Sequence, residues 1–278
     1  MSAERNTLLV VPEPTDWLGP VRSQLERVGS VEVFAPWALP DATPRAVGEA
    51  HDFLRRRVSS GAPAQPWFPA FTAFELGVRA YARGRAARQF AGRFVTRGAV
   101  DHLVAVALHQ GRWPGIARVV APSLGARRTF AAARARGMQC VLLEDAPDLS
   151  ELSHRLDAQA ERHPECPFLL NHRPRRRVIV DQRAERELAH AIGVRGAYAW
   201  TRLEARSGTK LFGLEVPLRT VEATGSMPGT VALAGPPVGR SGTMHLHALA
   251  DRLPDRRFIV DAGPDVEPRG LFEHPRVQ

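Results

Sequence analysis

Near the end of the chain, glycines, one cation and two hydroxyl residues follow an apolar run, in the sequence Gly-Pro-Pro-Val-Gly-Arg-Ser-Gly-Thr at 235–243. Such a loop could hold a phosphate, because backbone N–H groups at the start of a helix bind anions. The spacing excludes the phosphate loop of ATP hydrolases, in which four residues separate the first glycine from a Gly-Lys pair. Arg240 takes the place of that second glycine, and the only lysine of the chain is Lys210. Gly235, Arg240 and Thr243 are therefore candidates for an anion site of another kind.

Polar or small residues also follow strands predicted earlier in the chain. Asp16 and Gly19 come after the first strand, and Ser123 and Asp145 end two later ones. Ligands of an open α/β sheet bind beside the carboxyl ends of its strands, so these four residues are candidates for one cleft. Side chains in such positions also cap the helices that follow strands. The sequence leaves both interpretations open.

Alternating strands and helices must position these candidates. Apolar runs predict strands at 7–11, 31–36, 117–123 and 138–145. Apolar residues at helical spacing predict helices at 21–28, 126–137 and 148–164, a helix from 178 that leads into a short apolar segment, and another helix at 198–208. This alternation predicts an α/β protein with a Rossmann-like, doubly wound parallel sheet.

A change of composition predicts a domain boundary. Residues 214–229 are rich in Pro, Gly and Thr, and a new strand, helix and strand follow them. We predict a Rossmann-like domain at 1–215, a linker at 216–229 and a partial second Rossmann-like unit at 230–278. One β-α-β unit is too small to stand alone, so it must pack on the first domain or on a partner.

The composition indicates a globular protein of basic character. The 278 residues are 44% hydrophobic and carry a net charge of +9, nearly all of it from arginine. Solvated helix faces explain most of these arginines, and an anionic partner is the alternative. Cys140 and Cys166 show neither metal-ligand nor disulfide-framework spacing, which favours a reducing cytoplasm. No apolar segment is long enough to span a bilayer, and no motif for nucleic-acid binding is present.

One segment combines aromatic and arginine residues at helical spacing, at 70–97. Such a stripe is typical of core packing with a solvated arginine face. It is also compatible with peripheral contact with an anionic membrane, here the inner face of the cell membrane. Both interpretations remain open.

Several of these segments occur together in a recognisable order. An alanine-rich helix at 126–137 precedes a strand that ends in an acidic pair at 140–145, and segments at 183–189 and 198–208 follow. In order and character they resemble the N-terminal half of family 4 glycosyltransferases of the GT-B type. The unit from 230 to 263 resembles the beginning of their donor-binding domain. The resemblance implies two Rossmann-like domains across a cleft. It also implies hexose transfer from a nucleotide-sugar to a bacterial glycan or glycolipid acceptor, without metal or other cofactor.

The resemblance assigns the donor's diphosphate to the loop at 235–243, near Arg240 and the helix start at Thr243. In the family, an arginine and a lysine of this loop stabilise the leaving diphosphate. Pro236 and Ser241 stand in their places here, and the family's Glu-x7-Glu motif would lie beyond Gln278. The sequence thus predicts an incomplete donor site. The alternative to a transferase is a non-catalytic fold that serves as a partner subunit or glycan-binding module, and a protein partner is one way to complete the second domain.

Overall fold

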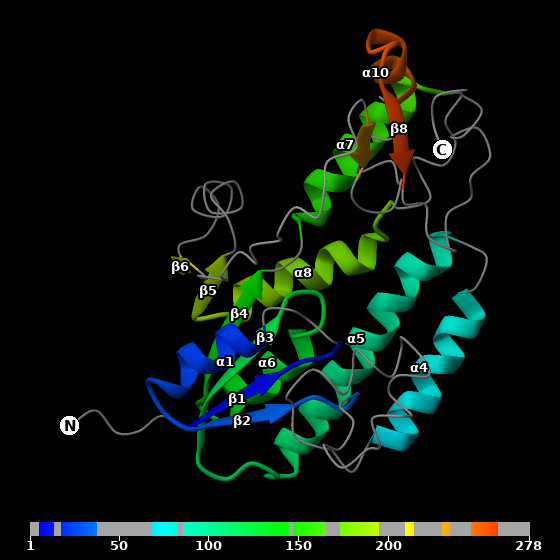
Figure 1. Ribbon diagram of the computed structural model, residues 1–278. Helices are drawn as coiled ribbons and strands as arrows, with labels where there is room; N and C mark the ends of the chain where they lie inside the picture. The colour runs from blue at the N-terminus through cyan, green and yellow to red at the C-terminus, as the bar shows by residue number, and fades with distance from the viewer. Residues whose placement is uncertain are drawn as a thin grey trace, which may run out of the picture. The chain divides into compact units, whose positions relative to one another are not determined.

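The computed structural model describes residues 6–13, 18–37, 68–82, 86–144, 147–164, 173–194, 209–213, 230–233 and 246–260 (Figure 1). The chain divides into two compact units that alternate along the sequence. The first comprises Met1–Val78, Arg93–Pro147 and Arg176–Leu218, and the second comprises Arg79–Gly92, Asp148–Arg175 and Arg219–Gln278. The boundaries proposed from the sequence, 1–215, 216–229 and 230–278, stay a prediction.

A six-stranded parallel sheet forms the centre of the first unit. Its strands are β1 (Asn6–Val10), β2 (Val31–Phe34), β3 (Ile116–Pro122), β4 (Gln139–Glu144), β5 (Ala191–Val194) and β6 (Lys210–Gly213). Their order is β2-β1-β3-β4-β5-β6, and every neighbouring pair is parallel. The predicted α/β class with a parallel sheet is confirmed. The short edge strand β6 was not expected, because Lys-Leu-Phe-Gly shows no alternation that separates it from a loop.

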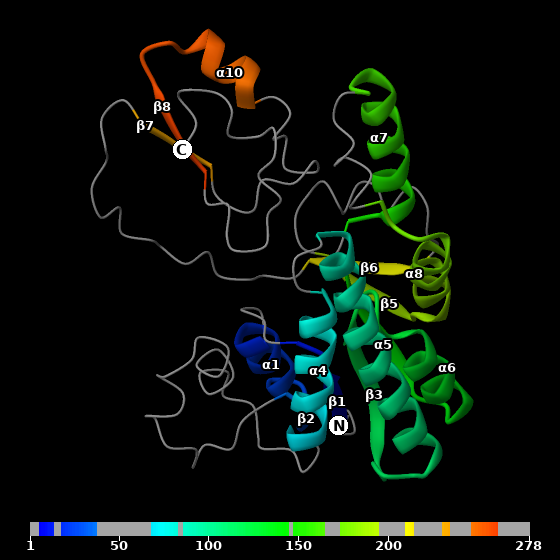
Figure 2. The ribbon, with the colours of Figure 1, turned by 90° about the vertical axis from the view of Figure 1, so that its right-hand side faces the viewer.

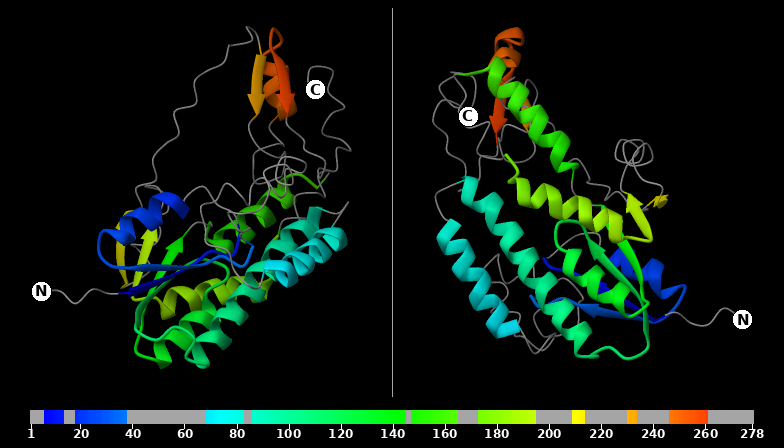
Figure 3. Two further views of the ribbon diagram at one scale, coloured as in Figure 1. Left: turned by 60° about the horizontal axis from the view of Figure 1, so that its bottom comes forward. Right: turned by 180° about the vertical axis from the view of Figure 1, so that it is seen from behind.

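Helices cover both faces of this sheet. They include α1 (Leu18–Glu26), α6 (Arg127–Ala135) and α8 (Arg176–Leu188). Figures 2 and 3 show α1 on one face and α6 with α8 on the other, and α6 packs against α8. The Rossmann-like, doubly wound arrangement is therefore confirmed. It follows from right-handed crossovers that leave β1 toward β2 in one direction and β3 toward β4 in the other.

The core lies between the sheet and its helices. Leu8, Leu9, Val10 and Val11 are fully buried one after another, as expected for a parallel strand covered on both faces. Phe130 of α6 is also fully buried.

The aromatic and arginine-rich segment forms two helices, α4 (Phe68–Ala82) and α5 (Ala86–His109). The sequence predicts helical structure only to residue 97, whereas α5 continues for three more turns, to His109. Val100, Val104 and Leu108 recur every four residues and are buried, which explains why the helix extends. The views agree that α4 runs beside α5 (Figure 3).

The second unit contains α7 (Leu149–Arg162) and a small β-α-β element made of β7 (Thr230–Leu233), α10 (Leu246–Arg252) and β8 (Arg257–Val260). Strands β7 and β8 are parallel. Helix α7 begins at a side-chain cap, in which Asp148 Oδ1 accepts a hydrogen bond of 2.9 Å from the Glu151 N–H. Among the described helices, none has the length and apolar character needed to cross a bilayer.

Candidate functional site

The sheet order defines a switch point between β1 and β3. These strands are neighbours, and the connections after them leave in opposite directions. In doubly wound sheets, the carboxyl ends of two such strands border the crevice that binds ligands. The residues at these ends are Val11 and Glu13 after β1, and residues 123–125 after β3. We call Glu13, residues 123–125 and the neighbouring Arg97 the switch-point site.

Arg97 of α5 joins the two strand ends. Its Nη1 donates a hydrogen bond of 2.6 Å to the Ser123 carbonyl, and its Nη2 donates one of 2.6 Å to Glu13 Oε1. The Arg97 side chain is 11% exposed and that of Glu13 is 28% exposed. Arg97 therefore compensates the charge of Glu13, while part of the Glu13 side chain stays in contact with solvent.

Backbone packing fixes the second side of the site. A Cβ atom placed on Gly125 would lie 2.9 Å from Arg97 Cβ and 3.2 Å from the Arg97 carbonyl oxygen. Contacts this short with backbone atoms cannot be relieved by a rotamer change. Glycine is therefore the residue that lets α5 approach the loop after β3, and it sets the position of Arg97.

A residue that follows β2 binds the end of β1. The indole N–H of Trp37, a fully buried residue, donates a hydrogen bond of 2.7 Å to the Val11 carbonyl. This bond satisfies a backbone acceptor just before Glu13, so it orients the chain that carries the carboxylate.

A carboxylate from α5 caps the first turn of α6. Asp101 Oδ2 accepts a hydrogen bond of 3.0 Å from the Arg128 N–H, and Oδ1 accepts one of 2.8 Å from the Thr129 N–H. Ala126, at the N-cap position, has no side chain that could do this. The cap therefore comes from a residue one helix away, which no local sequence pattern could indicate.

A second carboxylate, from α8, holds the loop that precedes α6. Glu185 Oε2 accepts a hydrogen bond of 2.7 Å from the Leu124 N–H, and Oε1 accepts one of 2.8 Å from the Ala126 N–H. Leu124 has a φ of 66°, a left-handed conformation that is rare for a residue with a side chain. The two bonds stabilise this conformation.

The environment of Glu185 disfavours its charge. Burial raises the pKa of Glu185 to about 7, although the N–H donors of Ala126 and Leu124 act in the opposite direction. The carboxylates of Asp101 and Glu144 raise this pKa further. Glu185 is 1% exposed, so water contributes little to solvating its ionised form.

These two acids occupy the N-terminus of α6. Asp101 and Glu185 together accept the N–H groups of Leu124, Ala126, Arg128 and Thr129, the donors that a phosphate would use at a helix start. The chain's own carboxylates therefore fill the anion site after β3. In the ion pair at the switch point, the Glu13 side chain is the more exposed partner.

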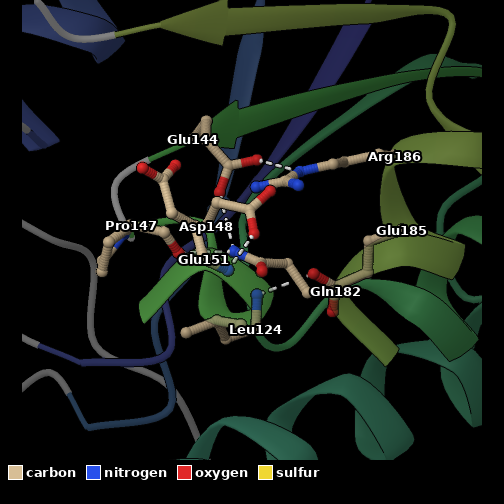
Figure 4. A network of polar contacts seen from close by, with 8 residues as sticks. All are labelled: Leu124, Glu144, Pro147, Asp148, Glu151, Gln182, Glu185 and Arg186. Carbon is tan, nitrogen blue, oxygen red and sulfur yellow. Dashed lines mark hydrogen bonds and ion pairs between the residues drawn. The ribbon is translucent and has the colours of Figure 1, made fainter. Parts of the chain in front are cut away.

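A third buried acid, Glu144, ends β4 and is bound by α8. Gln182 Nε2 donates a hydrogen bond of 3.2 Å to its Oε1, and Arg186 Nε donates one of 2.8 Å to its Oε2 (Figure 4). Gln182 Nε2 also donates to the Pro147 carbonyl at 2.9 Å. The side chains of Glu144 and Arg186 are 1% and 16% exposed, so this ion pair is largely withdrawn from water.

The structure describes two of the residues that the sequence nominated. Ser123 is fully buried, and its N–H donates a hydrogen bond of 2.9 Å to the Leu143 carbonyl. Gly19 lies in the first turn of α1, where an added Cβ would meet no atom within 4 Å. Their roles in ligand binding stay predictions. The remaining nominated residues lie outside the described part of the chain: Asp16, Asp145, Gly235, Arg240 and Thr243.

Sequence reasoning missed Glu13, Arg97, Asp101 and Glu185. Arg97 is the last residue of the segment predicted as a helix, at 70–97, and Asp101 lies one turn beyond it on α5. Glu185 lies in the helix predicted from residue 178, and the sequence does not distinguish it from the other acids of that helix. Within the described residues, no group of three or more His, Cys, Asp or Glu side chains could hold a metal ion.

The fold and the switch-point site define an α/β protein of the doubly wound class. No protein-family model matches the chain, and no curated protein does either. Among solved structures, it is similar to a UDP-glucosyltransferase from Polygonum tinctorium that glucosylates indoxyl. The identity is 14% and the TM-score 0.41, with 100% of this chain and 72% of that chain covered.

Two further solved structures are similar to this chain at equally low identity and TM-score. Medicago truncatula UGT71G1, solved with UDP-glucose, is 8% identical with a TM-score of 0.45, and the match covers 97% of this chain and 69% of that one. A putative UDP-N-acetylglucosamine 2-epimerase from Listeria monocytogenes is 9% identical with a TM-score of 0.44, at 99% and 68% coverage. Values this low identify neither a family nor an activity.

Proposed function

We propose that this chain is a glycosyltransferase-like protein of the GT-B type, in which the first unit binds a hydroxyl-bearing acceptor. The observation that carries the proposal is the partly exposed Glu13 carboxylate, which Arg97 holds at the switch point. A fixed carboxylate accepts hydrogen bonds from sugar hydroxyl groups. With the α6 N-terminus filled by Asp101 and Glu185, the crevice favours hydroxyl groups over phosphate.

The donor belongs to the second unit in this proposal. The β-α-β element of β7, α10 and β8 is the kind of unit whose first loop binds a diphosphate. Residues 235–243 lie in the sequence between β7 and α10, and the sequence resemblance to family 4 glycosyltransferases assigns the donor there. We infer that Gly235, Arg240 and Thr243 contact the diphosphate of a nucleotide-sugar, without a metal ion, and that the acceptor is a glycan or glycolipid.

Calorimetric titration with UDP, GDP and their sugars tests the donor site. We expect one of these nucleotides to bind, and Arg240→Ala to weaken binding at least tenfold, because a charge-assisted phosphate contact contributes roughly 1.5–3 kcal/mol. Arg252→Ala is the matched control, since Arg252 is an exposed arginine of α10 in the same unit, and it should bind like the wild type. If no nucleotide binds at millimolar concentration, the transferase proposal fails. The non-catalytic partner subunit or glycan-binding module is then the better description.

We also propose peripheral contact between α4, α5 and an anionic lipid surface. Phe74, Leu76 and Tyr81 of α4 are 41%, 49% and 69% exposed, and Val95 of α5 is 50% exposed. Residues 76–100 contain no Asp or Glu, and besides Arg97, which pairs with Glu13, they contain five arginines: Arg79, Arg83, Arg85, Arg88 and Arg93. Leu76, Tyr81 and Val95 lie within this stretch, and exposed apolar side chains in a basic, acid-free stretch are complementary to anionic headgroups. This contact would bring a glycolipid acceptor to the enzyme at the inner membrane face.

Flotation with lipid vesicles tests this contact. We expect the chain to float with vesicles that contain anionic phosphatidylglycerol and to remain at the bottom with purely zwitterionic vesicles. The double change Phe74→Ser and Tyr81→Ser should reduce flotation several-fold, because each aromatic side chain contributes apolar burial. Val28→Ser removes an apolar side chain that is 61% exposed outside α4 and α5, and it should leave flotation unchanged. Equal behaviour with both lipid mixtures would refute the proposal.

A further inference from the structure

Glu185 is the least accessible acid of the loop region, and the proposed chemistry does not use it. It reaches from α8 to the loop at 123–126, which carries one side of the switch-point site. Both of its oxygens are bound to backbone N–H groups of this loop, at 2.7 and 2.8 Å. A carboxylate that bridges Leu124 and Ala126 fixes the relative position of their peptide planes.

The loop needs this fixation because its conformation is unfavourable by itself. Leu124 has a φ of 66°, a conformation that costs a residue with a side chain roughly 1–2 kcal/mol. Next to it, Gly125 lies against the backbone of Arg97. This turn is therefore in close contact with Arg97, which binds both the Ser123 carbonyl and Glu13.

The charges that face Glu185 come from two other elements. Asp101 of α5 and Glu144 of β4 both act on it as negative neighbours. Arg186 pairs with Glu144, and Arg127 of α6 pairs with Asp181 of α8. The two carboxylate oxygens of Asp101 accept hydrogen bonds from the N–H groups of Arg128 and Thr129. Arg97, Arg127 and Arg186 are thus paired with acids other than Glu185, whereas the two oxygens of Glu185 accept hydrogen bonds from backbone N–H groups.

We propose that Glu185 is the positioning residue of the switch-point site, and that its protonation state sets how firmly the loop at 123–126 is held. This proposal rests on the proposed function for its significance, since the loop borders the crevice assigned to the acceptor. Glu185 touches no substrate. It acts through Leu124 and Gly125 on Arg97, and through Arg97 on Glu13.

The direction of the effect follows from proton linkage. In the closed loop the pKa of Glu185 is about 7, whereas a solvated glutamate has a pKa near 4.3. When the loop opens and Glu185 reaches water, the open form releases its proton more readily than the closed form. Raising the pH from about 4.3 to about 7 therefore favours opening, by up to tenfold per pH unit, and above pH 7 the effect levels off. The closed loop is therefore most stable in mildly acidic solution, because burial disfavours the charged form of Glu185 more than the two N–H groups favour it.

Amide hydrogen exchange of the full chain, resolved by NMR between pH 5 and pH 8, tests this without any ligand. After correction for intrinsic exchange, the protection factors of the Leu124 and Ala126 amides should fall by up to about a hundredfold, with a plateau above pH 7. The Glu151 amide, which is bound to Asp148 in the second unit, serves as the control, and its protection factor should show no such fall between pH 5 and pH 7. pH-independent protection of both loop amides in the wild type would overturn the proposal.

Two variants assign the titrating group. Glu185→Gln keeps the size of the side chain but cannot ionise, so its loop amides should show protection that does not change with pH. The same pH profile in this variant as in the wild type would overturn the proposal. Glu144→Gln removes one negative neighbour of Glu185, and the plateau should then begin at lower pH; an unchanged plateau would also count against the proposal. Because no nucleotide is used, these outcomes are independent of whether the chain binds a donor.

Discussion

Replacing Arg186 with methionine should lower the free energy of unfolding by ~3–5 kcal/mol, because it leaves the Glu144 carboxylate buried without its cation. Glu144 is 1% exposed, and its Oε2 lies 2.8 Å from Arg186 Nε. Urea denaturation followed by circular dichroism measures the change. Arg183→Met is the matched control on the same helix, since Arg183 pairs with Glu187 at 83% and 64% exposure. We expect this control to cost less than about 0.5 kcal/mol.

A double variant separates the lost attraction from the cost of a buried charge. Glu144→Gln combined with Arg186→Met removes both charges and keeps an acceptor for Gln182. It should recover most of the stability lost in Arg186→Met, because no uncompensated charge remains. If the double variant is instead less stable than Arg186→Met alone, the ion pair contributes through packing, and the burial argument is wrong.

Truncating Trp37 to alanine should cost ~3–5 kcal/mol, since a fully buried indole is removed and a cavity remains. Trp37→Phe keeps most of the apolar volume but removes the donor to the Val11 carbonyl. We expect it to cost roughly 1–3 kcal/mol, the penalty for leaving one buried acceptor unpaired. Both values come from the same denaturation measurement, with Val28→Ala at an exposed position as the baseline.

The difference between the two Trp37 variants also reports on the site. The Val11 carbonyl lies two residues before Glu13. Trp37→Phe should therefore lower the stability at the end of β1 by more than the small loss of core volume explains, because the carbonyl loses its donor. A Trp37→Phe protein as stable as the wild type would show that water replaces the indole N–H at the Val11 carbonyl.

Much of the fold could be predicted from sequence because its elements follow local rules. The runs Leu8–Val11 and Val119–Ala121 are continuous apolar segments, as parallel strands buried on two faces require. The alanine-rich helix that became α6 ends near Gly137, which has a φ of 72° and terminates it as a C-terminal glycine. Strand β6 is the exception, since four residues carry too little periodicity.

The switch-point site could be predicted only as a location. Ser123 was nominated because it ends a strand, and the structure describes it at the end of β3. Glu13, Arg97 and Glu185 were not nominated, because their importance arises from contacts between residues 26 to 84 positions apart. No pattern within one helix or strand encodes such a pairing. The proposed donor residues from 235 to 243 stay predictions.

The N-terminus of α6 depends on segments that the ribosome produces at different times. Asp101 precedes the loop by about two dozen residues, whereas Glu185 follows it by about sixty. While the chain is being synthesised, β3 and α6 are therefore complete well before the carboxylate that holds Leu124 exists. The crevice of the first unit can reach its final shape only after α8 has emerged and packed against α6. A nascent chain halted before Arg176 would carry β3 and α6 but not the carboxylate that holds the loop at 123–126.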